Sequence, residues 1–189
     1  MTRPVLREYH PDDEVAARAM YQAAFPASLR APWSEIAGHR DDEQLLVLHD
    51  GDGSRIGLTL IRHLGDTGIA FVRYLAIDAD RRGRGLGALL VTLLRDRLRE
   101  DGVGVLLLDV EVPLGEHAED DRRRIAFYLR CGLDLLDVPG YAPPDHGETG
   151  EVVPLVLMGE VLDGGPTLAG DRLLEAANAV LRHRYGVGD

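Results

Sequence analysis

Residues 71–99 read FVRYLAIDADRRGRGLGALLVTLLRDRLR, and this stretch is the most informative about the fold. The stretch begins with an apolar run rich in strand formers, 71–77, and continues with a short polar turn. The glycines of 82–87 come next, and after them leucines are spaced as on a buried helix face. The glycines therefore lie where a strand turns into a helix. A helix start exposes backbone N–H groups and the positive end of the helix dipole. Glycine also lets a phosphate approach closely, because it has no Cβ. The stretch thus predicts a site for an anion, most simply a pyrophosphate.

Two common nucleotide motifs do not fit the residues around this loop. All 21 residues counted as Lys+Arg are arginines. The chain therefore lacks the lysine of a Walker P-loop and the lysine of a pyridoxal phosphate Schiff base. A dinucleotide fingerprint spaces its glycines as G-x-G-x-x-G, whereas here they stand at 83, 85 and 87.

Two motifs resemble the GNAT N-acetyltransferase superfamily. Arg82-x-x-Gly85-x-Gly87, after a strand that ends Leu-Ala-Ile, is similar to its acyl-coenzyme A signature, [Arg/Gln]-x-x-Gly-x-[Gly/Ala]. Residues 125–133, IAFYLRCGL, resemble the family's helix end, A-x-F-Y-x-x-x-G-[Phe/Leu]. The motifs stand in the expected order with a strand between them, and the resemblance covers roughly residues 3–161.

The resemblance implies an acetyl-CoA-dependent N-acetyltransferase that moves an acetyl group to a primary amine by direct transfer in a ternary complex. Backbone N–H groups of 82–88 would bind the pyrophosphate, and the N–H of Ile77 would hold the thioester carbonyl. Tyr128 would be the catalytic acid that protonates the departing sulfur. The residues expected to bind coenzyme A are Leu75, Ala76, Ile77, Arg82, Gly83, Arg84, Gly85, Leu86, Gly87, Ala88 and Tyr128.

The general base is predicted from an unusual strand. Alternation in 105–112 places Asp109 and Glu111 on one face of an otherwise apolar strand, where a carboxylate is costly without a partner. Glu111 lies near the carboxyl end of this strand, so we expect it to act as base or as amine anchor. The alternative is a salt bridge to one of the arginines at 122–124. The asparagine that the family often carries after this strand is missing from 113–124. The sequence therefore does not identify the residue that would bind the pantetheine arm there.

Three aromatic residues are expected to line the acceptor site. By the resemblance, Phe25 and Trp33 belong to a pair of helices that forms one wall, although both also fit simple core positions. Tyr141 would close the pocket from a later loop, together with His146 and Glu148. Small amines, aminoglycosides, amino acids and protein N-termini all remain possible acceptors.

The expected fold is α/β (α+β), with a GNAT-like mixed, mostly antiparallel sheet of about seven strands, helices on both faces and a C-terminal helix. Residues 1–162 would form the acetyltransferase domain, and 163–189 a linker and helical extension. That last helix packs either on its own domain or on a second subunit, so a homodimer is possible. Strands are expected at 5–9, 44–49, 55–64, 69–77, 103–112, 133–138 and 151–162, and helices at 12–25, 33–39, 85–100, 122–131 and 171–184.

Composition narrows the function further. A net charge of -11 argues against binding to nucleic acid or an anionic membrane. No apolar run approaches a membrane span, and a single cysteine is typical of a reducing compartment, so we expect a cytoplasmic protein without a metal. Two alternatives to the enzyme are a non-catalytic coenzyme A-binding sensor or scaffold of the same fold and an α/β protein that binds another nucleotide.

Overall fold

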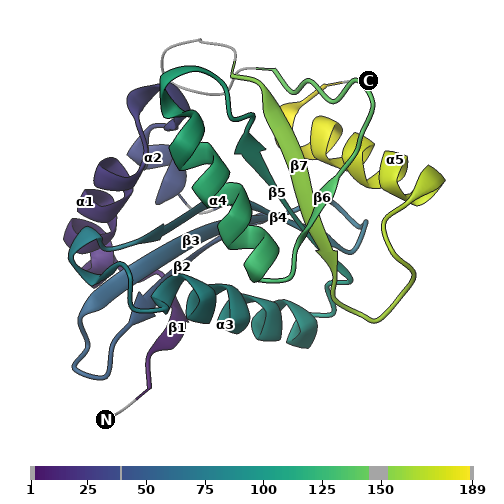
Figure 1. Ribbon diagram of the computed structural model, residues 1–189. Coiled ribbons are helices and arrows are strands. Elements are labelled where there is room, and N and C mark those ends of the chain that lie inside the picture. Colours follow the sequence, from purple (N-terminus) through teal and green to yellow (C-terminus); the bar gives the residue numbers. More distant parts are fainter. Residues whose placement is uncertain (1–2, 39, 145–152, 188–189) are drawn as a thin grey trace. The chain divides into compact units, whose positions relative to one another are not determined.

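The computed structural model describes residues 3–38, 40–144 and 153–187 (Figure 1). Its seven-stranded sheet has the order β1-β2-β3-β4-β5-β7-β6, and the pairs β1–β2, β2–β3, β5–β7 and β6–β7 are antiparallel. The predicted α/β class with a mostly antiparallel sheet and a C-terminal helix is confirmed. The strands are β1 (Val5–Glu8), β2 (Glu43–His49), β3 (Arg55–His63), β4 (Ile69–Ile77), β5 (Val105–Glu111), β6 (Asp134–Leu136) and β7 (Leu155–Val161). The α-helices are α1 (Glu14–Ala24), α2 (Trp33–Ile36), α3 (Leu86–Glu100), α4 (Ala118–Arg130) and α5 (Gly170–Ala179).

The described chain divides into two compact units. The first holds the residues up to 62 and residues 72–97, and the second holds 63–71, 98–144 and 153–187. Each unit has a core of its own.

The first unit builds its core between α1 and strands β2 to β4. Tyr21, Val47 and Leu58 are buried there together. The β2–β3 register shifts beside Gly57, between Leu48 and His49. A Cβ on Gly57 would lie 2.9 Å from the Ile77 side chain. The glycine is therefore needed because β4 passes so close.

A buried ion cluster ties α2 to the strands of this unit. Arg73 donates to Glu43 at 2.6 Å and to Glu35 of α2 at 2.9 Å, and Arg62 lies 2.8 Å from Glu43. The side chains of Arg73 and Glu43 are each only 2% exposed. The partners compensate for most of the desolvation that burial imposes on these charges.

The second unit packs α5 on β5 and β7. Leu107 and Leu157, which face the same core, enclose Ala176, Ala177 and Val180 of the C-terminal segment. In Figure 1, α4 lies in front of β5 and α5 behind β7. The C-terminal helix thus packs on its own chain, one of the two arrangements left open by its leucine pattern. After Ala179 the helix widens into a π-helical turn, Val180–Arg184, that carries its C-cap, Tyr185.

The predicted start of the fourth helix is wrong. The helix that holds the second motif was expected to start at Arg122, but α4 begins at Ala118. Glu119, Asp120 and Asp121 occupy its first turn, where carboxylates stabilise the positive end of the helix dipole. These residues looked like a polar loop because none of them continues an apolar stripe.

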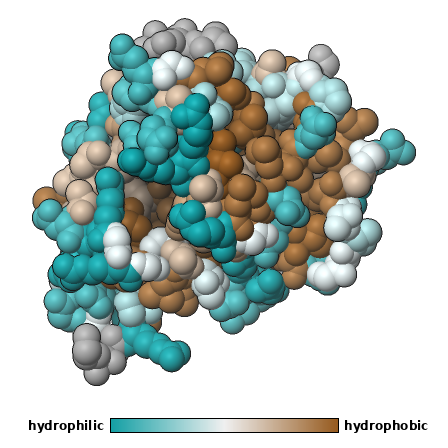
Figure 2. All heavy atoms as spheres, viewed as in Figure 1, coloured by the Kyte–Doolittle hydropathy of each residue, from teal (hydrophilic) through white to brown (hydrophobic). Residues whose placement is uncertain are grey.

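Apolar surface remains on the second unit. In Figure 2, apolar side chains gather over β6 and β7. Leu129 of α4 and Leu135 of β6 are 48% and 52% exposed.

Candidate functional site

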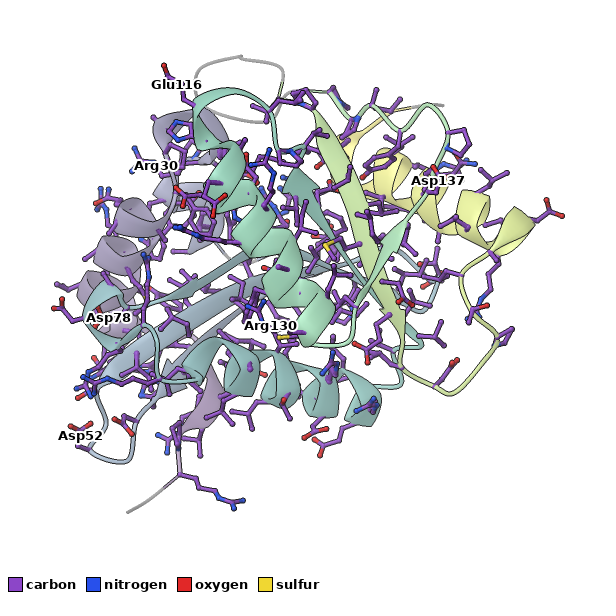
Figure 3. All side chains as sticks on the ribbon, in the orientation of Figure 1. Arg30, Asp52, Asp78, Glu116, Arg130 and Asp137 are labelled. Carbon is purple, nitrogen blue, oxygen red and sulfur yellow. The ribbon has the colours of Figure 1, made fainter. Side chains whose placement is uncertain are left out.

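The predicted anion site begins where β4 ends. Asp78, labelled in Figure 3, caps a single 3-10 turn at Ala79–Arg81, and its carboxylate accepts from the N–H of Asp80 at 3.2 Å. Arg81 lies 3.6 Å from Asp50 of the β2–β3 turn. This elbow delivers the chain to the glycines and then to the first turn of α3.

Two glycines of this loop take a backbone conformation that other residues rarely adopt. Gly83 has φ 75° and Gly85 has φ 77°. Apart from the glycine itself and its chain neighbours, no atom of the described residues lies within 4 Å of a Cβ built at either position. The space beside them is open, so their lack of a side chain is not explained by packing within the protein.

The first turn of α3 presents unused donors. The first bond of its ladder runs from the N–H of Leu89 to the carbonyl of Gly85, at 3.0 Å. The N–H groups of Leu86, Gly87 and Ala88 therefore precede the intrahelical hydrogen bonds and point toward the helix start. Together with the dipole, they can hold an anion.

The arginines of the loop differ from one another. Arg82 donates from Nε to the carbonyl of Ile77 at 3.2 Å, so its guanidinium is held over the end of β4. Arg84 is exposed. Before the loop, Ile77 packs with Leu90, and Leu75 is half-buried beside them, whereas Ala76 lies in the core under α1.

Phe25 and Trp33 both line the edge of the first unit's core. Each is partly buried against it. The ring of Phe25 lies 5.0 Å from that of Tyr74, and the indole of Trp33 donates to Glu14 at 2.7 Å. They have core partners and remaining exposure, so either role discussed above is compatible with their positions.

Tyr128 lies in the last turns of α4, in the second unit. Its side chain is buried, 7% exposed. Burial raises the pKa of Tyr128 to about 12, although the nearby Arg124 opposes the rise. The phenol therefore keeps its proton at neutral pH, as a proton donor requires.

Glu111 forms an ion pair with Arg124 of α4. Its side chain is 13% exposed. Arg124 also lies 3.8 Å from Asp121, whose pKa is raised by burial and then by the charge of Glu111. Of the three arginines at 122–124, Arg124 thus contacts Glu111. The ion pair fixes the position of the Glu111 carboxylate.

Asp109 stands at the centre of a hydrogen-bond network that the sequence does not reveal. Tyr141 donates to one carboxylate oxygen at 2.7 Å, and Tyr185 donates to the other at 2.5 Å. Burial raises the pKa of Asp109 to about 6, while the two phenols and the nearby Arg184 oppose the rise and Glu111 adds to it. The same contacts raise the pKa of Tyr141, after the larger effect of its own burial.

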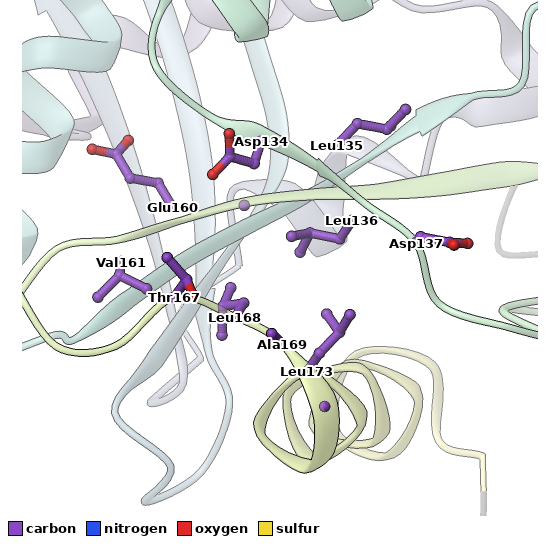
Figure 4. Close-up of a pocket in the computed structure, with 12 residues that line it drawn as sticks. Asp134, Leu135, Leu136, Asp137, Glu160, Val161, Thr167, Leu168, Ala169 and Leu173 are labelled. Carbon is purple, nitrogen blue, oxygen red and sulfur yellow. The ribbon is translucent and has the colours of Figure 1, made fainter.

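Two further predicted residues, His146 and Glu148, lie outside the described residues. A separate cavity of about 510 Å³ opens between β6, β7 and the start of α5 (Figure 4). Asp134, Asp137 and Glu160 provide carboxylates around it, and Leu136 and Leu168 provide apolar walls. None of the residues expected to bind coenzyme A or the acceptor lines this cavity.

The described residues contain neither a cluster of metal ligands nor a membrane-spanning helix. Within residues 3–38, 40–144 and 153–187, no three His, Cys, Asp or Glu side chains gather as metal ligands. Across the same ranges, every helix is too short or too polar to span a bilayer.

The sequence profile of the Acetyltransferase (GNAT) family matches residues 6–133. The chain therefore belongs to the GNAT acetyltransferase family, whose members use acetyl-CoA. None of the curated protein sequences matches the chain.

Solved structures show the same fold. A GNAT-family protein from Bacteroides thetaiotaomicron is 21% identical with a TM-score of 0.77, covering 97% of this chain and 99% of that one. Spermidine N-acetyltransferase from Vibrio cholerae, in complex with CoA and spermine, is 14% identical with a TM-score of 0.67, covering 85% and 96%. Ribosomal-protein-S18-alanine N-acetyltransferase from Escherichia coli is 20% identical with a TM-score of 0.61, covering 89% and 97%. Because all three structures are less than 25% identical to this chain, their similarity shows a shared fold and no more.

Proposed function

We propose that this protein transfers the acetyl group of acetyl-CoA directly to a primary amine. The observation that carries the proposal is the open helix start at 83–88. There, two glycines with positive φ leave free space beside N–H groups that precede the helix ladder. A diphosphate fits these donors, and the family match makes coenzyme A its expected carrier.

The chemistry assigns separate tasks to individual residues. The amine nitrogen forms a bond to the thioester carbon, the C–S bond breaks, and Tyr128 gives its proton to the departing sulfur. The proton lost by the amine restores the phenol, directly or through a base, so no oxidant or metal takes part. The N–H of Ile77 would stabilise the carbonyl oxygen as charge develops on it.

Glu111 is proposed as the base or as the anchor of the ammonium group. Its ion pair with Arg124 supports the anchoring role in particular, because it holds the carboxylate in one position. Phe25, Trp33 and Tyr141 are proposed to line the acceptor site, and the donors of 82–88 with Leu75, Ala76 and Ile77 to hold coenzyme A.

Calorimetry with acetyl-CoA, coenzyme A and ATP tests the cofactor. We expect both coenzyme A forms to bind and ATP to bind far more weakly. Binding of ATP without coenzyme A would contradict the proposal.

Thiol release with a panel of primary amines then tests transfer. The panel includes spermidine, phosphinothricin and a peptide with N-terminal alanine, acceptors named for structural neighbours. Direct transfer predicts intersecting initial-velocity lines and full activity in a Cys131→Ser variant, since no acetyl-cysteine forms. Coenzyme A binding without turnover of any amine would favour the non-catalytic sensor instead.

A further inference from the structure

Asp109 is the one acid that faces the core of the second unit from the middle of β5. Val105 and Leu107, which lie on the same face of the strand as Asp109, are 6% and 0% exposed. A carboxylate in such surroundings needs hydrogen bonds to both oxygens. Tyr141 and Tyr185 each supply one.

The two phenols come from segments that are far apart in the chain. Tyr141 follows β6 and lies 32 residues from Asp109, and Tyr185 follows the π-helical turn and lies 76 residues away. Both rings pack against the core cluster of Val105 and Leu107. The family match ends at residue 133, so both phenols come from outside it.

The C-terminal segment is built to present Tyr185. Ala177, Ala179 and Val180 are buried and hold α5 against the strands. The π-helical turn then adds a residue to the helical repeat, and such turns are frequent at functional sites. The guanidinium of Arg184 lies 4.9 Å from the centre of the Tyr185 ring, over its face. The ring is thus held both by packing and by a cation–π contact.

We propose that Tyr185 is a positioning residue of the acceptor site, acting through the carboxylate of Asp109 on Tyr141. The inference rests on the proposed function, in which Tyr141 lines the acceptor site and Glu111, two residues along β5, contacts the amine. The C-terminal helix thereby becomes part of acceptor binding through Tyr185 and Asp109.

The network also makes this coupling depend on pH. The groups that face Asp109 are Tyr141 from the loop after β6, Tyr185 and Arg184 from the C-terminal segment, and Glu111 from its own strand. Each phenol bond favours the ionised carboxylate. Removing the hydroxyl of Tyr185 therefore raises the pKa at which Asp109 ionises and leaves one oxygen without its donor.

The test measures kcat and both KM values from pH 5.5 to 8.5 for the best acceptor of the amine panel. We expect Tyr185→Phe to raise the acceptor KM about 3- to 10-fold, with kcat and the acetyl-CoA KM within about 2-fold of wild type. The ratio of variant to wild-type KM should be largest near pH 6 to 7, where a larger fraction of the wild-type carboxylate than of the variant carboxylate is ionised. Taking the ratio cancels the ionisation of the amine itself.

A double-mutant cycle sharpens the result. If both phenols act on one carboxylate, Tyr141→Phe with Tyr185→Phe should raise the acceptor KM by less than the product of the single effects. Leu174→Ala, on the exposed side of α5, is the matched control and should change none of these constants. Amide exchange over residues 137–144 should quicken in Tyr185→Phe and not in the control.

The outcomes separate this inference from the proposed function. An active enzyme whose acceptor KM is unchanged by Tyr185→Phe would overturn the positioning role alone. A fall in kcat with both KM values unchanged would also overturn it, because that pattern would indicate a smaller folded fraction of enzyme and not a change at the acceptor site. A wild-type protein that binds coenzyme A but acetylates no amine would overturn the proposed function and the positioning role with it.

Discussion

The proposed coenzyme A loop and the Asp109 network differ in how each would hold a charged group. The loop at 82–88 uses main-chain N–H groups, exposed and freed by glycines within seven residues of sequence. The network uses three side chains from β5, the loop after β6 and the C-terminal segment, packed against one apolar cluster. Main-chain recognition therefore leaves a local pattern in the sequence, whereas side-chain recognition depends on how distant segments pack.

The largest effect should come from closing the main-chain site. Gly85→Val places a β-branched residue at φ 77° and puts its side chain where the diphosphate would lie. We expect the affinity for acetyl-CoA to fall about 100-fold or more, measured by calorimetry. Gly53→Val is the control, because Gly53 has φ 85° and equally open space in the β2–β3 turn, next to Asp52 in Figure 3. Equal loss of binding in both variants would mean that backbone strain, and not the loop, is responsible.

Tyr128→Phe tests whether a buried side chain acts in the chemistry. Because the pKa of Tyr128 is raised to about 12, the phenol is protonated throughout the working range and can donate. We expect kcat to fall about 100-fold while the coenzyme A affinity stays within about 2-fold. Unchanged turnover would remove Tyr128 from the mechanism.

Asp109→Asn tests the cost of ionising the network. The pKa of Asp109 is raised from 3.8 to about 6, so its contribution to stability is present below about pH 4 and is lost as pH rises through 6. Two pKa units correspond to at most about 3 kcal/mol. As pH rises from 4 to 7.5, the wild type should therefore lose up to this amount of unfolding free energy relative to Asp109→Asn. Urea denaturation of both proteins measures the difference. A constant difference across that range would show that Asp109 ionises normally.

Glu111→Gln should have the smallest effect and distinguishes its two proposed roles. An anchor predicts an acceptor KM raised about 10-fold with kcat preserved, and a base predicts the same loss in kcat. Glu119→Gln, an exposed ion-pair partner on α4, is the control and should leave both constants unchanged. A variant with wild-type kcat and KM would leave Glu111 only its structural contact with Arg124.

The sequence-based predictions succeeded where the signal is local or periodic. Strand β4 was predicted at its observed bounds, and α3 starts one residue after its predicted position. The start of α4 was missed by four residues, because an acidic first turn carries no apolar stripe. The glycines of 83–87, which are proposed to bind coenzyme A, were singled out from spacing alone, and Gly83 and Gly85 have positive φ. The partner of Glu111 could be narrowed to three neighbouring arginines but not chosen among them.

Tyr185 illustrates what sequence could not provide. It lies beyond the family match, and nothing in its neighbourhood, RHRYG, indicates a contact with a strand 76 residues earlier. The buried pairing of Arg73 with Glu43 is similar, since along the chain Arg73 merely interrupts an apolar strand and Glu43 ends an acidic run.

The amino-acid sequence by itself determined the class of fold and the family, and it pointed to the proposed main-chain anion site, because helix periodicity, strand alternation and glycine conformation all act within a few residues. Tertiary structure decided which charges meet: Arg124 with Glu111, Arg73 with Glu43, and two phenols with Asp109. A buried charge takes its partner from whichever segment the packed core brings within hydrogen-bond distance, and separation along the chain does not restrict that choice.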